Sequence, residues 1–68
     1  MIIHLKEEYI KLGQALKLAN LVETGADAKV VIQDGEVEVN GETEVRRGRK
    51  LYPGDIVDFD GEQILILE

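Results

Sequence analysis

One short segment concentrates most of the chemistry that this chain offers, the run Arg46-Arg47-Gly48-Arg49-Lys50. It holds four of the eight Lys and Arg residues in a chain whose formal net charge is -6. A guanidinium group can donate two parallel hydrogen bonds to one phosphate. Gly48 lets the backbone bend, so that neighbouring side chains can splay apart. The run therefore predicts a loop that binds phosphate groups.

The remainder of the chain is acidic, which on average argues against a polyanionic partner. The sequence contains 14 Asp and Glu residues and its pI is near 4.6, so phosphate is repelled at long range. Local charge must therefore produce any binding of a polyanion. The alternative interpretation is a solvated surface loop whose cations aid solubility or pair with the nearby Glu42 and Glu44.

The residue types that most catalytic and metal sites need are scarce. The chain has no cysteine and no serine, and His4 is its only histidine. A thiol or serine nucleophile is therefore excluded, and His4 lacks the cysteine or second histidine of a zinc shell. No pair of carboxylates has a spacing that suggests a matched acid and base. We expect a protein that is not an enzyme and needs no cofactor or metal.

Length and hydropathy predict one small domain over residues 1–68. A chain of this size buries only about 60% of its unfolded surface, so its core must be thin. The longest apolar run, Ile64–Leu67, is far shorter than the roughly 20 residues that cross a bilayer. Residues 1–5 lack the charged and apolar regions of a signal peptide. We expect a soluble, cytoplasmic monomer that has no membrane partner.

Two segments have apolar residues at helical spacing. The first predicts a helix over residues 13–21. Its apolar stripe consists of Leu12, Ala15, Leu16, Ala19 and Val22. The second predicts a helix over residues 26–33. Thr24 is its expected N-cap, and Asp27 three residues later completes an imperfect capping box. Gly35 suits the left-handed position after that helix.

The apolar period then falls to two, which predicts strands. Val37 and Val39 precede Asn40-Gly41, a dipeptide that favours a type I′ hairpin turn. Residues 43–45 are therefore expected to fold back along the first strand.

Two further turns follow in the last third of the chain. Tyr52-Pro53-Gly54-Asp55 is typical of a type II turn, and Asp60-Gly61 of a last hairpin. The apolar terminal segments, residues 1–5 and 63–67, are expected to pair with each other. These elements predict an α+β domain, two short consecutive helices packed on a small, mostly antiparallel sheet of about five strands.

In this order, several segments resemble the S-four domain, an RNA-binding module named after ribosomal small-subunit protein four. The segments are Lys11-Leu12-Gly13, Thr24-Gly25-Ala26-Asp27-Ala28-Lys29, Gly35-Glu36-Val37-Glu38-Val39-Asn40-Gly41 and Tyr52-Pro53-Gly54-Asp55-Ile56. The likeness covers residues 11–59. Its most specific parts are the Gly-x-Val-x-Val-Asn-Gly string and the Pro-Gly-Asp turn behind it. Free-standing bacterial versions of the domain are similar in length and in the basic loop.

The resemblance implies that the two helices and the following hairpin grip structured ribosomal or transfer RNA. Matched by position, Lys11 stands where the family usually has an arginine, and Lys29 stands at a basic position of the second helix. Gly13 replaces the usual Asp, and Thr24-Gly25 replaces the usual Ser-Arg. The missing arginine removes one phosphate contact, for which the basic loop can compensate.

The candidate RNA ligands come from the loop, the helices and one aromatic residue. They are Arg46, Arg47, Arg49, Lys50, Lys29, Lys11, Thr24 and Tyr52. Thr24 marks a helix N-terminus whose free N–H groups suit a phosphate, although capping by its own hydroxyl is the simpler role. Tyr52 can stack on a base or pack against Pro53. No motif position supports Lys17.

Two functional hypotheses follow. The first is a non-catalytic protein that binds structured RNA, above all ribosomal RNA, through phosphate contacts, in ribosome assembly or on the ribosome. The scarcity of aromatic residues favours recognition of RNA shape and backbone over base sequence. The second is a protein-interaction module whose acidic sheet face docks on a basic partner such as a ribosomal protein. The residues expected on that face are Glu36, Glu38, Asp58, Asp60 and Glu62.

Overall fold

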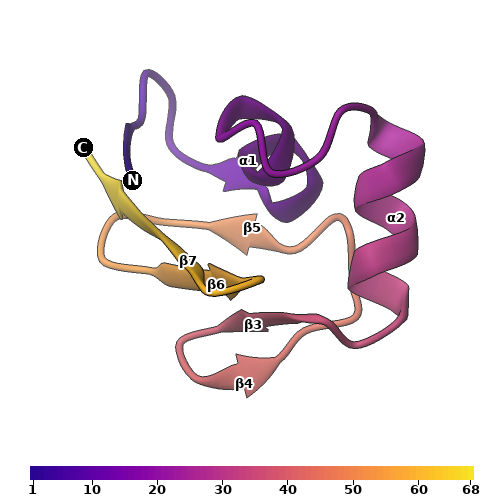
Figure 1. Ribbon diagram of the computed structural model, residues 1–68. Coiled ribbons are helices and arrows are strands. Elements are labelled where there is room, and N and C mark those ends of the chain that lie inside the picture. Colours follow the sequence, from indigo (N-terminus) through magenta and orange to yellow (C-terminus); the bar gives the residue numbers. More distant parts are fainter.

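A computed structural model describes residues 1–68 and contains two helices and seven strands (Figure 1). In chain order the elements are β1 (Ile2–His4), β2 (Ile10–Lys11), α1 (Leu12–Leu18), α2 (Gly25–Gln33), β3 (Val37–Val39), β4 (Glu42–Thr43), β5 (Lys50–Leu51), β6 (Ile56–Phe59) and β7 (Glu62–Leu67). No helix is both long and apolar enough to span a lipid bilayer.

Five strands form the main sheet in the order β1-β7-β6-β3-β4. The β1–β7 pair is parallel, with Ile3 opposite Ile66, and the other pairs are antiparallel. The two chain ends therefore lie side by side, as Figure 1 shows. The predicted α+β fold and the pairing of the terminal segments are both confirmed.

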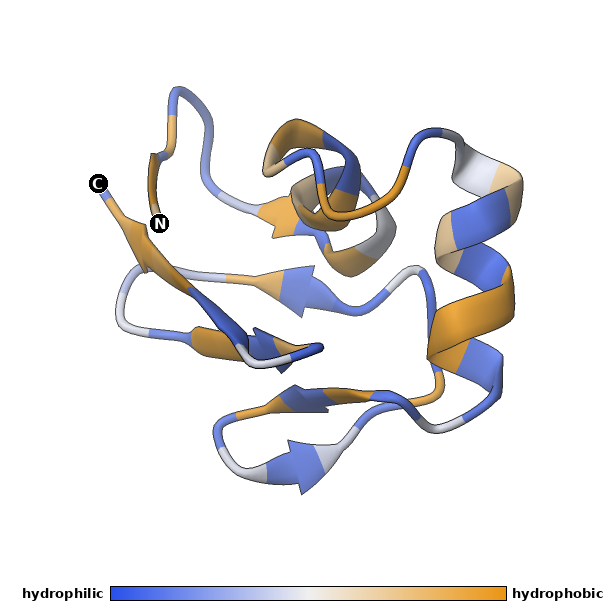
Figure 2. Cartoon of the chain, in the orientation of Figure 1, coloured by the Kyte–Doolittle hydropathy of each residue, from blue (hydrophilic) through white to orange (hydrophobic).

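The core consists of 12 apolar residues from both helices and the strands. In β3, Val37 and Val39 are buried while Glu38 between them is exposed, as the period of two predicts. Leu12, Leu16 and Ile32 supply the helical side of the core. Figure 2 shows hydrophobic stretches in both helices and in most strands, interrupted by hydrophilic residues.

The helix boundaries differ from the predicted ones. Helix α1 ends at Leu18 rather than at residue 21, because Asn20 adopts the left-handed conformation with φ 59°. The Asn20 N–H donates to the Lys17 carbonyl and the Leu21 N–H to the Leu16 carbonyl, which is the Schellman pattern. Helix α2 begins one residue earlier than predicted, at Gly25.

The predicted cap and turns are confirmed. The Thr24 hydroxyl accepts the Asp27 N–H at 3.1 Å. Asn40-Gly41 and Asp60-Gly61 all have positive φ, as type I′ turns require. Gly54 has φ 98°, and the Asp55 N–H donates to the Tyr52 carbonyl at 3.0 Å. The chain after Asn40-Gly41 does fold back, but its strand β4 covers only Glu42–Thr43.

The two most specific parts of the family likeness meet in space. The Asn40 side chain donates to the Asp55 carboxylate at 3.0 Å and accepts the Ile56 N–H at 2.9 Å. The Asp55 carboxylate also accepts the Tyr52 N–H at 2.8 Å. These bonds tie the β3–β4 hairpin to the turn before β6. The separation of the Asn-Gly string and the Pro-Gly-Asp turn in the sequence therefore corresponds to a direct contact between them in the fold.

Strands β2 and β5 form a separate two-stranded ladder that the sequence analysis did not predict. Ile10 pairs with Leu51, and Lys11 pairs with Lys50. The ladder places the start of α1 directly beside the end of the basic loop.

Candidate functional site

The basic loop, residues 46–50, is fixed to the first turn of α1 by its backbone. The Arg49 carbonyl accepts the Leu12 N–H at 2.8 Å, and the Arg47 carbonyl accepts the Gly13 N–H at 3.1 Å. The first N–H groups of a helix have no partner within the helix, and here the loop supplies one for two of them. The loop is thus held against the helix rather than left free in solution.

Gly13 permits this close approach. A Cβ atom at position 13 would lie 2.8 Å from Cγ of Arg47, closer than side-chain atoms normally come. The aliphatic part of Arg47 therefore lies directly over the helix backbone. Gly13 therefore makes room for the Arg47 side chain.

Glu44 organises two of the three arginines. It is the one buried charged residue, with 5% of its surface exposed. Its carboxylate accepts the Nε and Nη2 groups of Arg46 and the Nη1 group of Arg49, each at 3.0 Å. It also accepts the backbone N–H groups of Val45 and Arg46 at 3.1 Å. All five of these hydrogen bonds come from Val45 and the basic loop.

These contacts shift the ionisation of Glu44. Its pKa is lowered to about 2, first by the side-chain hydrogen bonds of Arg46, against which burial acts, and then by those of Arg49. The same hydrogen bonds raise the pKa of Arg46. At neutral pH the carboxylate is therefore charged and remains so well into the acidic range.

The alternative interpretation of the loop is thus correct in part. Glu44 forms the only two salt bridges of the structure, with Arg46 and Arg49, while Glu42 forms none. The four cations of residues 46–50 less this one carboxylate leave a local charge of +3. The Arg46 side chain is still 72% exposed and that of Arg49 is 30% exposed. Pairing with Glu44 positions the two guanidinium groups without removing them from solvent.

Two hollows lie on either side of Gly48, and neither is lined by a carboxylate. The first has a volume of about 340 Å³ and lies between the starts of both helices and the loop. It is lined by Lys11, Gly13, Gln14, Lys17, Gly25, Arg47 and Gly48. The second has a volume of about 580 Å³ and is lined by Arg46, Gly48, Arg49 and Lys50. Together they present six cations, which we call the basic surface.

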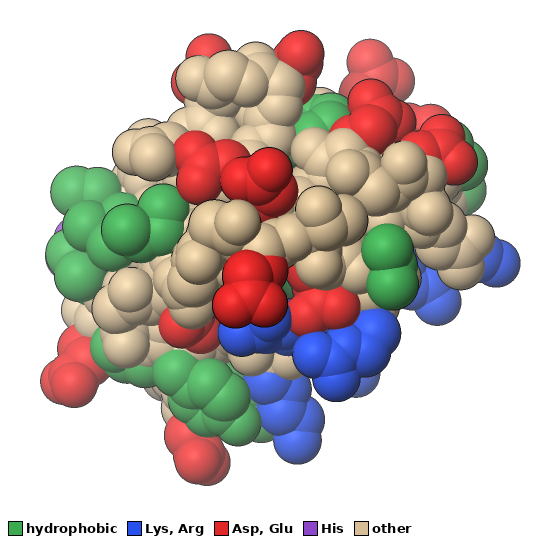
Figure 3. Space-filling view, turned by 90° about the horizontal axis from the view of Figure 1, so that it is seen from below, with side chains coloured by type: hydrophobic (Ala, Val, Ile, Leu, Met, Phe, Trp, Pro, Cys, Tyr) green, Lys and Arg blue, Asp and Glu red, His purple; other side chains and the backbone are tan.

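The basic surface differs from the rest of the molecule. Figure 3 shows Lys and Arg side chains in the lower and right-hand part of the view, with some acidic side chains against them, and Asp and Glu side chains spread over much of the remainder. A third hollow, of about 530 Å³, lies on the main sheet and is lined by residues of β3, β6 and the β6–β7 turn. Its acidic members are Glu36, Glu38, Asp58 and Asp60. No cluster of His, Asp and Glu side chains could hold a metal ion.

Five of the eight candidate ligands from the sequence lie on the basic surface. They are Arg46, Arg47, Arg49, Lys50 and Lys11. Lys29 is exposed on α2 but lines neither hollow. The Thr24 hydroxyl is engaged as the cap of α2. Tyr52 is exposed and lies next to Tyr9. Contact of all eight with RNA remains a prediction.

Three contributors to the site are absent from the predicted ligands. Lys17 lines the first hollow; its place on the first helix was noted in the sequence, but it was left out because no motif position supports it. Gly13 was noted as a departure from the family, but its contact with Arg47 depends on the fold. Tyr9 lies beside Tyr52 because of the β2–β5 ladder, which has no signal in the sequence.

Comparisons with known proteins show that the chain is similar to S4 domain proteins with names related to RNA or the ribosome. The family model described as "S4 domain" matches residues 3–67. A protein of Bacillus subtilis (strain 168) named "Probable ribosome maturation protein RlbA" is 49% identical over 59 residues, which cover 87% of this chain and 83% of that protein. "Putative RNA-binding protein YbcJ" of Escherichia coli (strain K12) is 36% identical over 62 residues, covering 91% and 89%.

Solved structures show the same fold. The solution structure of YbcJ from E. coli, described as revealing an "ALFAL motif involved in RNA-binding", superposes with a TM-score of 0.75 at 34% identity. That match covers 98% of this chain and 86% of YbcJ. The crystal structure of the 30S ribosomal protein S4e from Thermoplasma acidophilum has a TM-score of 0.69 at 20% identity and covers 85% of this chain and 31% of that one. The second likeness concerns the fold alone.

Proposed function

This chain belongs to the S4 domain family, and from that premise we propose that it binds structured ribosomal RNA through phosphate contacts during ribosome maturation. The single observation that carries the proposal is the basic surface. Six cations from α1, the residue before it and the basic loop line two adjoining hollows that contain no carboxylate. In a protein of net charge -6, such a concentration is suited to a polyanion.

The arrangement of the surface favours backbone recognition. Arg46 and Arg49 are held in place by Glu44, and a pre-positioned guanidinium fork loses little freedom when it binds phosphate. Lys17 and Arg47 form no salt bridge and line the first hollow. These groups can contact phosphates on two strands of an RNA helix or at a bend. The role in ribosome maturation, and with it a cytoplasmic location, is supported by the name of the RlbA relative.

The proposal is tested by the salt dependence of RNA affinity. With about five phosphate contacts, the slope of log affinity against log salt concentration is expected to be roughly -3.5 to -4.5. The variant Arg47→Gln/Lys50→Gln removes two cations that have no carboxylate partner, so it should weaken binding without leaving Glu44 unpaired. The slope should become less steep by roughly 1.4 to 1.8.

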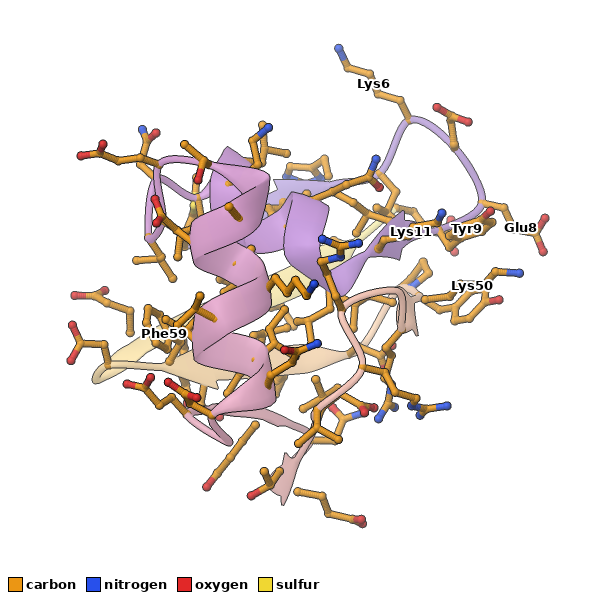
Figure 4. The ribbon with its side chains drawn as sticks, turned by 90° about the vertical axis from the view of Figure 1, so that its right-hand side faces the viewer. Lys6, Glu8, Tyr9, Lys11, Lys50 and Phe59 are labelled. Carbon is orange, nitrogen blue, oxygen red and sulfur yellow. The ribbon has the colours of Figure 1, made fainter.

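Lys6→Gln is the control for the loss of a surface cation outside the basic surface. Lys6 is exposed in the segment after β1 and lines neither basic hollow, and Figure 4 shows its side chain extending away from the body of the molecule. Its substitution should leave the slope nearly unchanged. An affinity for ribosomal RNA fragments that does not depend on salt, or equal effects of both variants, would refute the proposal.

A second candidate function rests on the acidic hollow of the main sheet. Glu38 and Asp58 lie directly opposite each other on β3 and β6, an arrangement of like charges that opposes pairing and that a basic protein surface would relieve. On this hypothesis the chain also docks on a basic partner such as a ribosomal protein. Glu36→Lys/Glu38→Lys should then abolish recovery of the partner while RNA binding stays equal or becomes stronger. Recovery of the same partner by the variant would exclude this role.

A further inference from the structure

The β2–β5 ladder has an inner and an outer face. Leu51 is fully buried, and its partner Ile10 packs against the core. Successive side chains of a strand point to opposite faces. Tyr9, Lys11, Lys50 and Tyr52 therefore belong to the outer face of the ladder, where both lysines and Tyr52 are exposed and Tyr9 is partly buried.

The outer face brings together the only two tyrosines of the chain. Extending the register by one residue sets Tyr9 opposite Tyr52, and their ring centroids are 6.1 Å apart with an angle of 51° between the planes. The ammonium group of Lys50 lies 4.8 Å from the centroid of the Tyr9 ring. Tyr52 is 42% exposed, and neither tyrosine is among the side chains that pack against the core. The pair is a surface feature.

The same face carries an unfavourable pair of charges. Lys11 and Lys50 are direct partners in the ladder, and like charges at such positions are destabilising. No carboxylate forms a salt bridge with either lysine. In Figure 4, Tyr9, Lys11 and Lys50 lie at one edge of the molecule, where Glu8 points outward, and Phe59 lies on the opposite side. A bound anion would relieve the repulsion between the lysines.

An aromatic pair beside two unneutralised cations matches the two parts of a nucleotide. We propose that the outer face of the β2–β5 ladder binds an unpaired nucleotide of the RNA, with its base stacked on the exposed ring of Tyr52 beside Tyr9 and its phosphate held by Lys11 and Lys50. This inference rests on the proposed function and deepens it, because the ligand becomes structured RNA with an adjoining single-stranded segment. Lys11 and Lys50 also line the two basic hollows, so the strand would continue from the basic surface onto this face.

A thermodynamic cycle tests the inference with two model RNAs, a blunt hairpin and the same hairpin with a short unpaired tail. Wild-type protein should bind the tailed RNA more tightly. Tyr52→Leu should lose that preference by about 5- to 150-fold, the range expected for one stacked base, measured as the ratio of its affinities for the tailed and the blunt hairpin. Tyr52→Phe keeps a ring and should retain the preference, which separates stacking from bulk.

Fluorescence gives a second measurement on the unmodified protein. The chain has no tryptophan, so its intrinsic emission comes only from Tyr9 and Tyr52. The tailed hairpin should quench this emission at saturation, and the blunt hairpin should not. Circular dichroism checks that Tyr52→Leu keeps the fold.

The outcomes separate this inference from the proposed function. If both hairpins bind in a salt-dependent manner but Tyr52→Leu keeps the tail preference, or the tail causes no quenching, the nucleotide site is refuted and RNA binding stands. If neither hairpin nor ribosomal RNA binds, both proposals fail. Loss of tail preference in Tyr52→Leu together with its retention in Tyr52→Phe supports the site.

Discussion

Gly13 allows the Arg47 side chain to lie against the start of α1, because a side chain at position 13 would collide with Arg47. The position is helical and does not have positive φ, so alanine is conformationally acceptable there and even gains about 1 kcal/mol of helix propensity. The cost of Gly13→Ala should therefore appear in the position of Arg47 rather than in the fold.

We predict that Gly13→Ala leaves the free energy of unfolding within about 1 kcal/mol of wild type. Its RNA affinity should fall by about 3- to 10-fold, since one guanidinium contact is weakened rather than removed. Urea denaturation and RNA titration measure the two quantities. Gly25→Ala is the control, because a Cβ at position 25 meets no atom within 4 Å. Equal RNA affinity of Gly13→Ala and wild type would show that Arg47 adapts freely.

Glu44 makes a stability prediction that depends on pH. Its pKa is about 2 in the folded protein against an ordinary value of 4.5, so the ionised form is favoured by folding. The stabilisation is complete above pH 4.5 and is lost as the pH falls from there toward 2. The pKa difference sets an upper limit of about 3 kcal/mol, and screening around the exposed Arg46 reduces it to roughly 1–2 kcal/mol.

The measurement compares wild type with Glu44→Gln. At pH 7 the wild type should be more stable by roughly 1–2 kcal/mol, and the difference should shrink steadily between pH 4.5 and 2.5. Glu7→Gln serves as the control because Glu7 is exposed, forms no salt bridge and lies outside the acidic hollow. A stability difference that stays constant across this pH range would mean that the Glu44 charge contributes nothing.

Among the elements, the end of α1 depends on a single left-handed residue. Asn20 has φ 59° and donates its N–H to the Lys17 carbonyl. Asn20→Ala should lower the free energy of unfolding by about 1 kcal/mol, because a Cβ-bearing residue without a polar side chain is strained in this conformation. Asn20→Gly should be at least as stable as wild type. Thermal melting of both variants checks this, and a destabilised glycine variant would contradict it.

The elements with strong local signals were predictable, and those without were not. Asn40-Gly41 and Asp60-Gly61 identify hairpins because few residues accept positive φ, and the alternation in residues 37–39 fixes the buried face of β3. Strands β2 and β5 have two residues each, too few for any period. The end of α1 was missed because asparagine marks a helix end less clearly than glycine does.

The same distinction holds for the site. The four cations of residues 46–50 are consecutive apart from Gly48 and were found directly. The sequence did not decide which glutamate pairs with them. Glu42 and Glu44 are two residues apart, so in one strand both would point to the same face. Only Glu44 follows the end of β4, where its N–H donates to the Val37 carbonyl and its side chain turns inward. The tertiary structure, not the local sequence, therefore determines which glutamate pairs with the arginines.

At the scale of the whole molecule, the cations are concentrated on one surface while the chain as a whole is acidic. Added salt should therefore have opposite effects on the stability of the fold and on RNA affinity. The net charge of -6 makes the folded chain repel itself, so added salt should stabilise the fold. RNA binding depends on attraction to phosphate and should weaken in the same titration. Loss of RNA affinity at high salt must therefore occur while the protein becomes more stable.

We predict that raising NaCl from low to molar concentration increases the melting temperature by a few degrees, about what 1 kcal/mol or less produces in a domain of this size. RNA affinity should fall continuously over the same range. Glu36→Gln/Glu38→Gln relieves part of the self-repulsion on the acidic sheet face, so its melting temperature should depend less on salt while its RNA slope stays the same. If melting temperature and affinity fell together, the loss of binding would reflect unfolding, and the basic surface would lose its main experimental support.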